Sequence, residues 1–274
     1  MKGRGEIKPL TKVGRGYLYE AAQTAAGSTP IEAGEALMEV YPYSALSHWS
    51  ALAYHGLTDA PPRTIAAIVL VPRIQGIQAD PSDDFLAALK QSRKPSVLPC
   101  GTTPSDWEGL TRWEGIPWVS GLTPPRILDW DVEWDSSGRF FGVHEYRRLG
   151  YPVYVTSPEK TLVDALQKPQ LCSGIENVLR AWAVARDTLN ADELVQTVDR
   201  FDIGVLRQRV GFILDELGLS HPTVEGWRAR AQRGGSSRLL ASAPYASTYS
   251  ERWNLSINTP VTALHDARTP PRAP

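Results

Sequence analysis

The chain has 274 residues, of which 42% are hydrophobic and 22% charged, and its formal net charge is −1. These values are typical of a folded protein with a sizeable core, and they give no overall electrostatic reason to expect binding to nucleic acid or to a membrane. Two cysteines, Cys100 and Cys172, are too few for a disulfide framework, and no apolar run approaches the roughly 18 residues that a membrane helix needs. We therefore expect a cytoplasmic protein without a membrane partner.

The first twenty residues are locally basic. Two short β-prone pieces, Glu6–Leu10 and Tyr17–Tyr19, flank the turn-prone sequence KVGRG, which predicts a small hairpin. Its basic side chains are candidates for contacts with DNA phosphates: Lys2, Arg4, Lys8, Lys12 and Arg15. The alternative is a solvated, partly frayed N-terminus.

Two helices are expected next. Pro30 and Glu32 suit the first turn of a helix that runs to Met38. A second helix is expected over 44–55, with Gly56 as its C-cap.

The second of these helices carries the sequence SHWSALAYHGL, which raises the question of a hydrolase or a metal site. His48 and His55 are seven residues apart, so on a helix their backbones are separated by roughly 10 Å, too far to share a metal ion without a bend. No G-x-S-x-G sequence surrounds the serines, and the adjacent Ser47 and His48 are expected to point away from each other. The pattern therefore favours a packing helix whose histidines face outward or cap it, with no catalytic residue and no metal.

Residues 61–156 read as strands and loops. The apolar run 65–71 (IAAIVLV) predicts a buried strand, and 126–134 and 139–146 predict a hairpin joined by DSSG. The sequence 79–125 is rich in Pro, Gly, Ser and Trp, which indicates irregular connections.

An acidic strand, 129–135 (DWDVEWD), is the one candidate for metal chemistry. Alternation places Trp130, Val132 and Trp134 on one face and Asp129, Asp131, Glu133 and Asp135 on the other. Carboxylates two residues apart lie about 6.5 Å from each other and could share a hard cation, as in a two-metal nuclease. No lysine or histidine is close in sequence, so a solvated acidic face, or a surface for a basic partner, is favoured.

A strand at 151–156 leads into a series of helices that continues to Leu219. Ser157 suits the N-cap of the first helix, Pro158 its first position, and Glu159 the positive end of its dipole. Lys160 and Asp164 then form an i,i+4 pair. Apolar residues at helical spacing predict the buried faces of the later helices: Ile175, Val178, Leu179 and Trp182; Leu194, Val195 and Val198; Leu206, Val210, Ile213, Leu214 and Leu217.

An arginine-rich stretch precedes a last strand-like sequence, 253–258, and a tail at 265–274 that we expect to be disordered. Six arginines are candidates for a phosphate or partner surface: Arg207, Arg209, Arg228, Arg230, Arg233 and Arg238. Arg207 and Arg209 are expected on the outer side of their helix. The alternative is a solvated face. No nucleotide-binding, zinc or kinase motif is present, and no cofactor is expected.

Three stretches together resemble the AbiEi family, the antitoxins and transcriptional regulators of type IV abortive-infection toxin–antitoxin systems. The stretches are YSALSHWSALAYHGL (43–57), 150–182 around SPEKTLVDAL, and 207–219 (RQRVGFILDELGL) followed by ERWNLSIN (251–258). Each is weakly specific alone, but their order and rough spacing match, and together they span most of residues 30–258.

The resemblance implies an α+β protein with two functions. It implies a remnant wing of a winged-helix N-terminal region at 1–20, which would contact promoter DNA, and a larger mixed α/β antitoxin domain at 21–264, which would counter a nucleotidyltransferase-like toxin. No catalytic residue comes with it. In such proteins helices precede the wing, and here the hairpin starts close to Met1, so we expect contacts to phosphates that do not specify sequence.

Two other functions stay open at the level of the sequence. One is a protein-interaction module that binds no DNA and uses the acidic strand or the arginine stretch. The other is a metal-dependent nuclease built on 129–135. The sequence leaves the oligomeric state undetermined.

Overall fold

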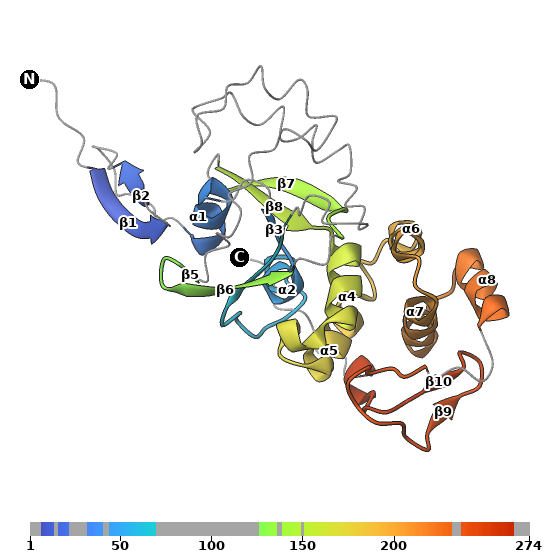
Figure 1. The fold of residues 1–274 in the computed structure, drawn as a ribbon. Coiled ribbons are helices and arrows are strands. Elements are labelled where there is room, and N and C mark those ends of the chain that lie inside the picture. Colours follow the sequence, from blue (N-terminus) through green and yellow to red (C-terminus); the bar gives the residue numbers. More distant parts are fainter. Residues whose placement is uncertain are drawn as a thin grey trace, which may run out of the picture. The chain divides into compact units, whose positions relative to one another are not determined.

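The computed structural model describes residues 7–13, 16–21, 32–40, 44–69, 126–135, 139–148, 151–231 and 237–265. Over these residues it contains seven α-helices and a six-stranded mixed sheet, which confirms the predicted α+β class (Figure 1). The chain divides into two compact units. Unit 1 comprises Met1–Leu46 and Arg63–Val155, and unit 2 comprises Ser47–Pro62 and Thr156–Pro274.

The basic N-terminal segment forms a two-stranded antiparallel hairpin, as predicted. Its strands are β1, Ile7–Val13, and β2, Gly16–Ala21, and their register shifts between Pro9 and Thr11. Lys8 and Lys12 lie on β1, where Lys8 is opposite Glu20 in the register. The other three candidate DNA contacts, Lys2, Arg4 and Arg15, fall outside the described residues.

The six-stranded sheet of unit 1 has the order β5-β6-β4-β3-β8-β7. In chain order its strands are β3 Ser44–Leu46, β4 Ile65–Val69, β5 Arg126–Ile127, β6 Trp130–Asp135, β7 Val143–Arg148 and β8 Tyr151–Thr156. β3 pairs with β4 in antiparallel and with β8 in parallel orientation, and β4 pairs with β6 in parallel orientation. Every residue of β3 and β4 is buried, which explains why their sequences do not alternate between polar and apolar.

Two predictions about these strands are wrong. Residues 126–134 are not one strand, because the chain turns at Leu128, whose φ is +51°, and Ile127 pairs with Trp130 across the turn. The predicted hairpin of 126–134 with 139–146 does not form either: β6 pairs with β4, and β7 is the neighbour of β8. A parallel pairing between distant segments outweighs the local hairpin signal.

The predicted helix over 44–55 is shorter than expected. Ser44–Leu46 is strand β3, and the helix α2 spans His48–Tyr54. The backbone of β3 is paired on both sides within the sheet, so tertiary pairing overrides the helical spacing of Ala45 and Leu46. The preceding helix, α1, spans Ala33–Val40 and confirms the helical prediction for the described part of 30–38.

Unit 2 is largely helical. Helix α2 comes before the strands β4 to β8 in the sequence, and five more helices follow β8: α4 Pro158–Gln167, α5 Ile175–Ala185, α6 Ala191–Phe201, α7 Gly204–Glu216 and α8 Pro222–Arg230. Helices α4 to α7 confirm the predicted series. Helix α8 was not predicted, although Pro222 at its first position and His221, whose Nδ1 accepts from Thr223 N at 3.2 Å, are recognisable start signals.

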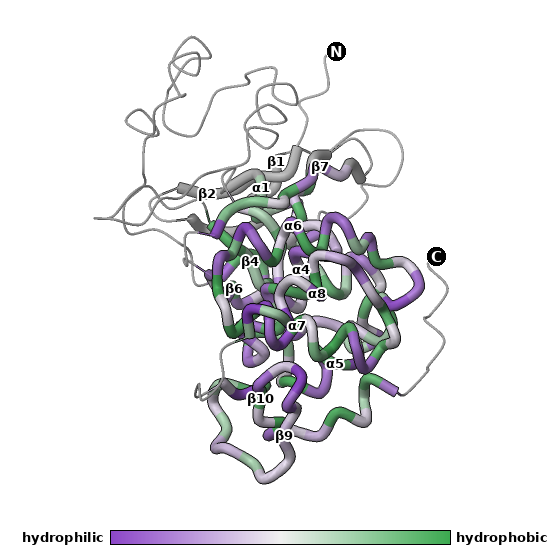
Figure 2. The backbone as a smooth tube through the Cα atoms, turned by 90° about the vertical axis from the view of Figure 1, so that its right-hand side faces the viewer, coloured by the Kyte–Doolittle hydropathy of each residue, from purple (hydrophilic) through white to green (hydrophobic). Residues whose placement is uncertain are grey.

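The core of unit 2 consists of the apolar faces that the helical spacing predicts. Leu162, Trp182, Val198 and Ile213 are fully buried. Figure 2 shows the corresponding alternation of hydrophobic and hydrophilic stretches along the helices. The C-terminal segment, with β9 Tyr249–Ser250 and β10 Leu255–Ser256, adds Trp253 to this core.

Candidate functional site

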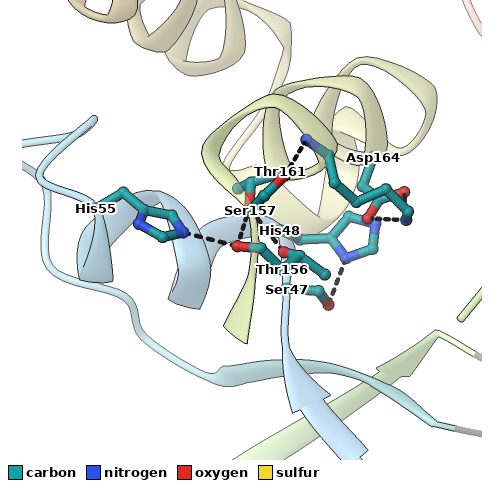
Figure 3. Close-up of polar contacts among 8 residues, drawn as sticks. Ser47, His48, His55, Thr156, Ser157, Thr161 and Asp164 are labelled. Atoms are coloured by element: carbon teal, nitrogen blue, oxygen red, sulfur yellow. Dashed lines mark hydrogen bonds and ion pairs between the residues drawn. The ribbon is translucent and has the colours of Figure 1, made fainter. Parts of the chain in front are cut away.

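The start of α2 places a serine and a histidine in contact. Ser47 Oγ lies 2.9 Å from His48 Nδ1, and the two residues are 0% and 1% exposed (Figure 3). The predictions that these side chains point apart and that His48 faces outward are wrong. The cause is the sharp turn from β3 into α2, where His48 has a φ of +47°, a value outside the helical region.

The start of α4 carries the other half of this polar cluster. Ser157 Oγ accepts from Lys160 N at 3.2 Å, which confirms the predicted N-cap. Lys160 Nζ lies 2.5 Å from both carboxylate oxygens of Asp164, and 4.9 Å from the ring centroid of Phe201 on α6. The predicted i,i+4 pair therefore exists, but Lys160 is 0% and Asp164 4% exposed, which the sequence does not indicate.

Hydrogen bonds tie α2 to the start of α4. His55 Nε2 donates to Thr156 O at 2.7 Å, and the hydroxyls of Thr156 and Thr161 are 2.7 Å apart (Figure 3). Glu159, expected to act on the helix dipole, also accepts from Asn190 N at 2.9 Å and so holds the start of α6.

This cluster is closed to solvent, so its chemistry is that of a buried structural network. A nucleophilic serine has to meet its substrate, and Ser47 is fully buried. Hydrogen bonds within the core pair the Ser47 and Ser157 hydroxyls and join Lys160 to Asp164, which offsets the cost of burying these groups. Among the described residues, no group of three or more His, Cys, Asp or Glu side chains is arranged to hold a metal ion.

Replacing the buried cap of α4 should destabilise the protein measurably. In Ser157→Ala the N–H of Lys160 loses its acceptor, and we expect the free energy of unfolding to fall by about 1 kcal/mol. Urea titration measures this. Ser220→Ala, at an exposed serine, is the control and should change the free energy by less than about 0.5 kcal/mol. Equal effects of the two variants would contradict the capping role.

The acidic strand does not present four carboxylates on one solvated face. Asp129 lies in the turn before β6, and Asp135 is 5% exposed, whereas Trp130 is 38% exposed. Asp131 is exposed and lies 3.8 Å from Arg126 Nε. The expected solvated acidic face is therefore wrong at Asp135, and the geometry gives no support to a shared cation.

The two arginines of α7 are bonded to other residues of unit 2, and Arg209 is buried. Arg207 Nε lies 2.8 Å from Asp199 Oδ1, and Arg207 Nη2 lies 3.1 Å from Asp202 Oδ1. Burial lowers the pKa of Arg207, but the hydrogen bonds to these two carboxylates and their negative charges together raise it more, so the net shift is upward. Arg209 is 8% exposed and donates to Arg238 O at 2.8 Å. Burial and the charge of Arg238 lower the pKa of Arg209, and its expected place on the outer side of the helix is wrong.

Three of the remaining candidate arginines lie in the described residues, and each is bonded to a nearby carboxylate or carbonyl group. On α8, Arg228 is exposed and paired with Glu225 at 3.1 Å, and Arg230 is exposed and donates to Gly226 O. Arg238 donates to Ala243 O at 3.0 Å and lies over the Tyr245 ring. Arg233 falls outside the described residues. Among the candidate arginines that the structure describes, Arg228 and Arg230 on α8 are therefore the exposed ones.

One exposed segment was not among the predicted surfaces. It is the uncharged segment 239–250, which ends with β9. It exposes Tyr245 and Tyr249, at 53% and 47% of their surface. The available signal was twelve consecutive residues without a charge, LLASAPYASTYS, in a chain in which 22% of the residues are charged.

Comparison with known proteins adds no family assignment. No protein-family model matches the chain, and no curated protein matches it in sequence. None of the helices in the described ranges combines the length and the hydropathy that crossing a bilayer requires.

Proposed function

We propose that this chain is an antitoxin and transcriptional autoregulator of the AbiEi type, acting in the cytoplasm against a nucleotidyltransferase-like toxin. The observation that carries the proposal is that segments from all three resembling stretches, although far apart in sequence, belong to one folded unit. Unit 2 takes the first stretch from Ser47 onward, the second from Thr156 onward, and all of 207–219 and 251–258. A resemblance that falls on one folded unit is better supported than three unrelated matches.

The polar residues in these stretches support a role without catalysis. Ser157, Lys160 and Asp164 in SPEKTLVDAL, and Ser47 and His48 in SHWSALAYHGL, are buried and bonded within unit 2. Their polarity is accounted for by helix capping and by pairing in the core. The resemblance therefore concerns a scaffold, and the toxin-countering role belongs to the surface of that scaffold.

The basic hairpin supports a contact with promoter DNA. β1 and β2 form a two-stranded ribbon that carries Lys8 and Lys12, which suits a wing lying along the phosphate backbone. Phosphate contacts give affinity that depends strongly on salt and weakly on sequence.

Fluorescence anisotropy with the chain's own upstream DNA and a scrambled duplex, at several salt concentrations, tests the DNA contact. We expect Lys8→Ala/Lys12→Ala to weaken binding to both duplexes and to reduce the slope of log affinity against log salt by about two. The matched variant, Arg228→Ala/Arg230→Ala, removes two exposed arginines from α8 and should leave the slope unchanged. The opposite result would place the phosphate contacts on α8, and absence of binding by the wild type would refute a DNA-binding role.

The toxin-countering role requires a separate test. If the neighbouring gene encodes a nucleotidyltransferase-like protein, its expression should arrest growth, and co-expression of this chain should restore growth. Restored growth without DNA binding would favour a protein-interaction module. Continued arrest with a well-expressed, folded chain would refute the antitoxin proposal.

A further inference from the structure

Arg209 on α7 is buried, and no described residue supplies it with a counter-ion. The residue is 8% exposed, and its side chain makes one hydrogen bond within the described part of the chain, from Nε to Arg238 O at 2.8 Å. A carbonyl oxygen carries no formal charge, so the charge of the guanidinium stays uncompensated. Other arginines of unit 2 are paired with carboxylates: Arg180, Arg207, Arg228 and Arg252.

Arg207, two residues earlier on the same helix, shows the usual solution. Burial lowers the pKa of Arg207, but Asp199 and Asp202 raise it more. At Arg209 burial is again the largest effect, and the positive charge of Arg238 adds to it, so the pKa is lowered. The charge that acts on the Arg209 guanidinium is therefore positive, which is the reverse of the situation at Arg207.

The two stretches of sequence that meet at Arg209 contain no acidic residue. Helix α7 has no Asp or Glu from 204 to 214, and the stretch 226–250 has none either. The second stretch instead contains four arginines: Arg228, Arg230, Arg233 and Arg238. A counter-ion for Arg209 has to come from outside these stretches, and a bound anion would provide it.

Hydrogen-bond donors without an acceptor lie where α7 meets the segment that follows α8 (Figure 1). Arg209 Nη1 and Nη2 have no acceptor among the described residues, and they are not enclosed by protein atoms, so they still contact solvent. Gln208 Oε1 accepts from Ser237 Oγ at 2.7 Å, which leaves Gln208 Nε2 as a further donor. Because Gln208 and Arg209 bond to the consecutive residues Ser237 and Arg238, the two side chains end along one short stretch of backbone. A guanidinium fork beside an amide suits the oxygens of an oxyanion.

A small oxyanion with more than one negative charge fits this place better than a polymer does. Arg209 is more than nine-tenths buried, which keeps the phosphates of a duplex away from it. The Arg238 guanidinium donates to Ala243 O at 3.0 Å and lies 5.0 Å from the Tyr245 ring centroid, so it contributes a second charge without a carboxylate. A phosphate group carries about −1.5 to −2 charges at pH 7, whereas a carboxylate carries one.

We infer that Arg209, assisted by Gln208 and by the charge of Arg238, forms a binding site for the phosphate group of a small molecule. The phosphate oxygens would accept from the Arg209 guanidinium and neutralise it. Because Arg209 also holds Arg238 O, the bound anion would stabilise the contact between α7 and the segment after α8. This inference does not depend on the proposed antitoxin function.

Isothermal titration calorimetry of the full chain with inorganic phosphate, in chloride buffer of constant ionic strength, tests it. The wild type is expected to bind phosphate saturably. Arg209→Met should weaken binding at least tenfold, because it removes the guanidinium fork. Arg238→Met keeps the carbonyl that Arg209 holds but removes the second charge, so it should weaken binding severalfold. Arg230→Met is the matched control, at an exposed arginine that also bonds to a carbonyl, Gly226 O, and should leave binding unchanged.

Thermal unfolding distinguishes a binding role from a purely structural one and shows that each variant is folded. Phosphate stabilises proteins in general, so its effect is compared between variants at equal ionic strength. We expect phosphate to raise the Tm of the wild type and of Arg230→Met more than that of Arg209→Met. Should Arg209→Met fail to fold, Arg238→Met decides.

A wild type without saturable phosphate binding would overturn the inference. Phosphate affinity that Arg209→Met and Arg238→Met both leave unchanged would overturn it as well and would leave Arg209 a structural role. Acetate binding as tight as phosphate binding would replace the phosphate with a carboxylate ligand. Duplex DNA that binds through Arg209, in the absence of phosphate binding, would assign the site to nucleic acid instead.

Discussion

Lys160→Met is expected to lower the free energy of unfolding by about 3–5 kcal/mol, the largest effect of any substitution considered for this chain. Lys160 is 0% exposed, and its ammonium lies 2.5 Å from both oxygens of Asp164. Removing the ammonium leaves a carboxylate in the core without its counter-ion, and the loss of that compensation is more costly than the loss of the contact itself. Urea denaturation followed by tryptophan fluorescence measures the change.

The double variant Lys160→Met/Asp164→Leu separates the unpaired charge from the packing. Because it removes both charges and keeps similar volumes, we expect it to recover most of the stability that Lys160→Met loses. Glu176→Ala is the control at an i,i+4 pair near the surface: Glu176 lies 2.8 Å from Arg180 and is 75% exposed, so its removal should cost less than about 1 kcal/mol. A double variant as unstable as Lys160→Met would contradict the role of the unpaired carboxylate.

Gly211→Ala is expected to destabilise the protein by about 1–3 kcal/mol, although alanine favours helices over glycine. Gly211 lies within α7, and a Cβ atom there would overlap the Cη2 and Cζ3 atoms of Trp253. Trp253 has little freedom to move aside, since it is 1% exposed and its Nε1 donates to Asp215 Oδ2 at 2.6 Å. The same denaturation experiment detects the loss.

Gly226→Ala provides a control of the opposite sign. Gly226 lies within α8, where the nearest atom to an added Cβ is the end of the Arg230 side chain at 4.0 Å. With that space available, the helix preference for alanine should stabilise the protein by up to about 1 kcal/mol. A stabilising effect of both variants would contradict the close packing of the Trp253 ring against Gly211 on α7.

The elements that the sequence predicts well are those whose signals are local. The helices of unit 2 follow from apolar spacing, as at Leu206, Val210 and Ile213, because one face of a helix is read within a few turns. The start of α4 follows from Ser157 and Pro158, since a cap bonds to a backbone group three residues away.

The features that the sequence does not predict depend on distant partners. Ser44–Leu46 has helical spacing but forms a strand because β4 and β8 take up its backbone hydrogen bonds. The burial of Lys160 depends on how α4 packs in unit 2, including the ring of Phe201 on α6, and an i,i+4 spacing is the same on a surface and in a core. The Ser47–His48 contact depends on the backbone turn at His48.

The candidate surfaces also show this difference between local signals and contacts with distant residues. Counting arginines located a basic stretch, but the structure pairs Arg207 with two aspartates and buries Arg209. The order of the uncharged segment 239–250 was not predicted, because it comes from Asn258 and Ser256, which lie beyond that segment in the sequence. The absence of charge was visible in the sequence, whereas the anchoring was not.

The discontinuity of unit 2 affects the order in which the chain can fold during synthesis. Helix α2 belongs to a unit whose other residues begin at Thr156, and its hydrogen bond from His55 to Thr156 joins residues 101 positions apart. At translation rates of 5–20 residues per second, α2 leaves the ribosome roughly 5 to 20 s before its partner helix. Over that interval its apolar residues, Leu52 among them, have no completed core to enter, so the nascent chain exposes apolar surface that is open to aggregation and to chaperones.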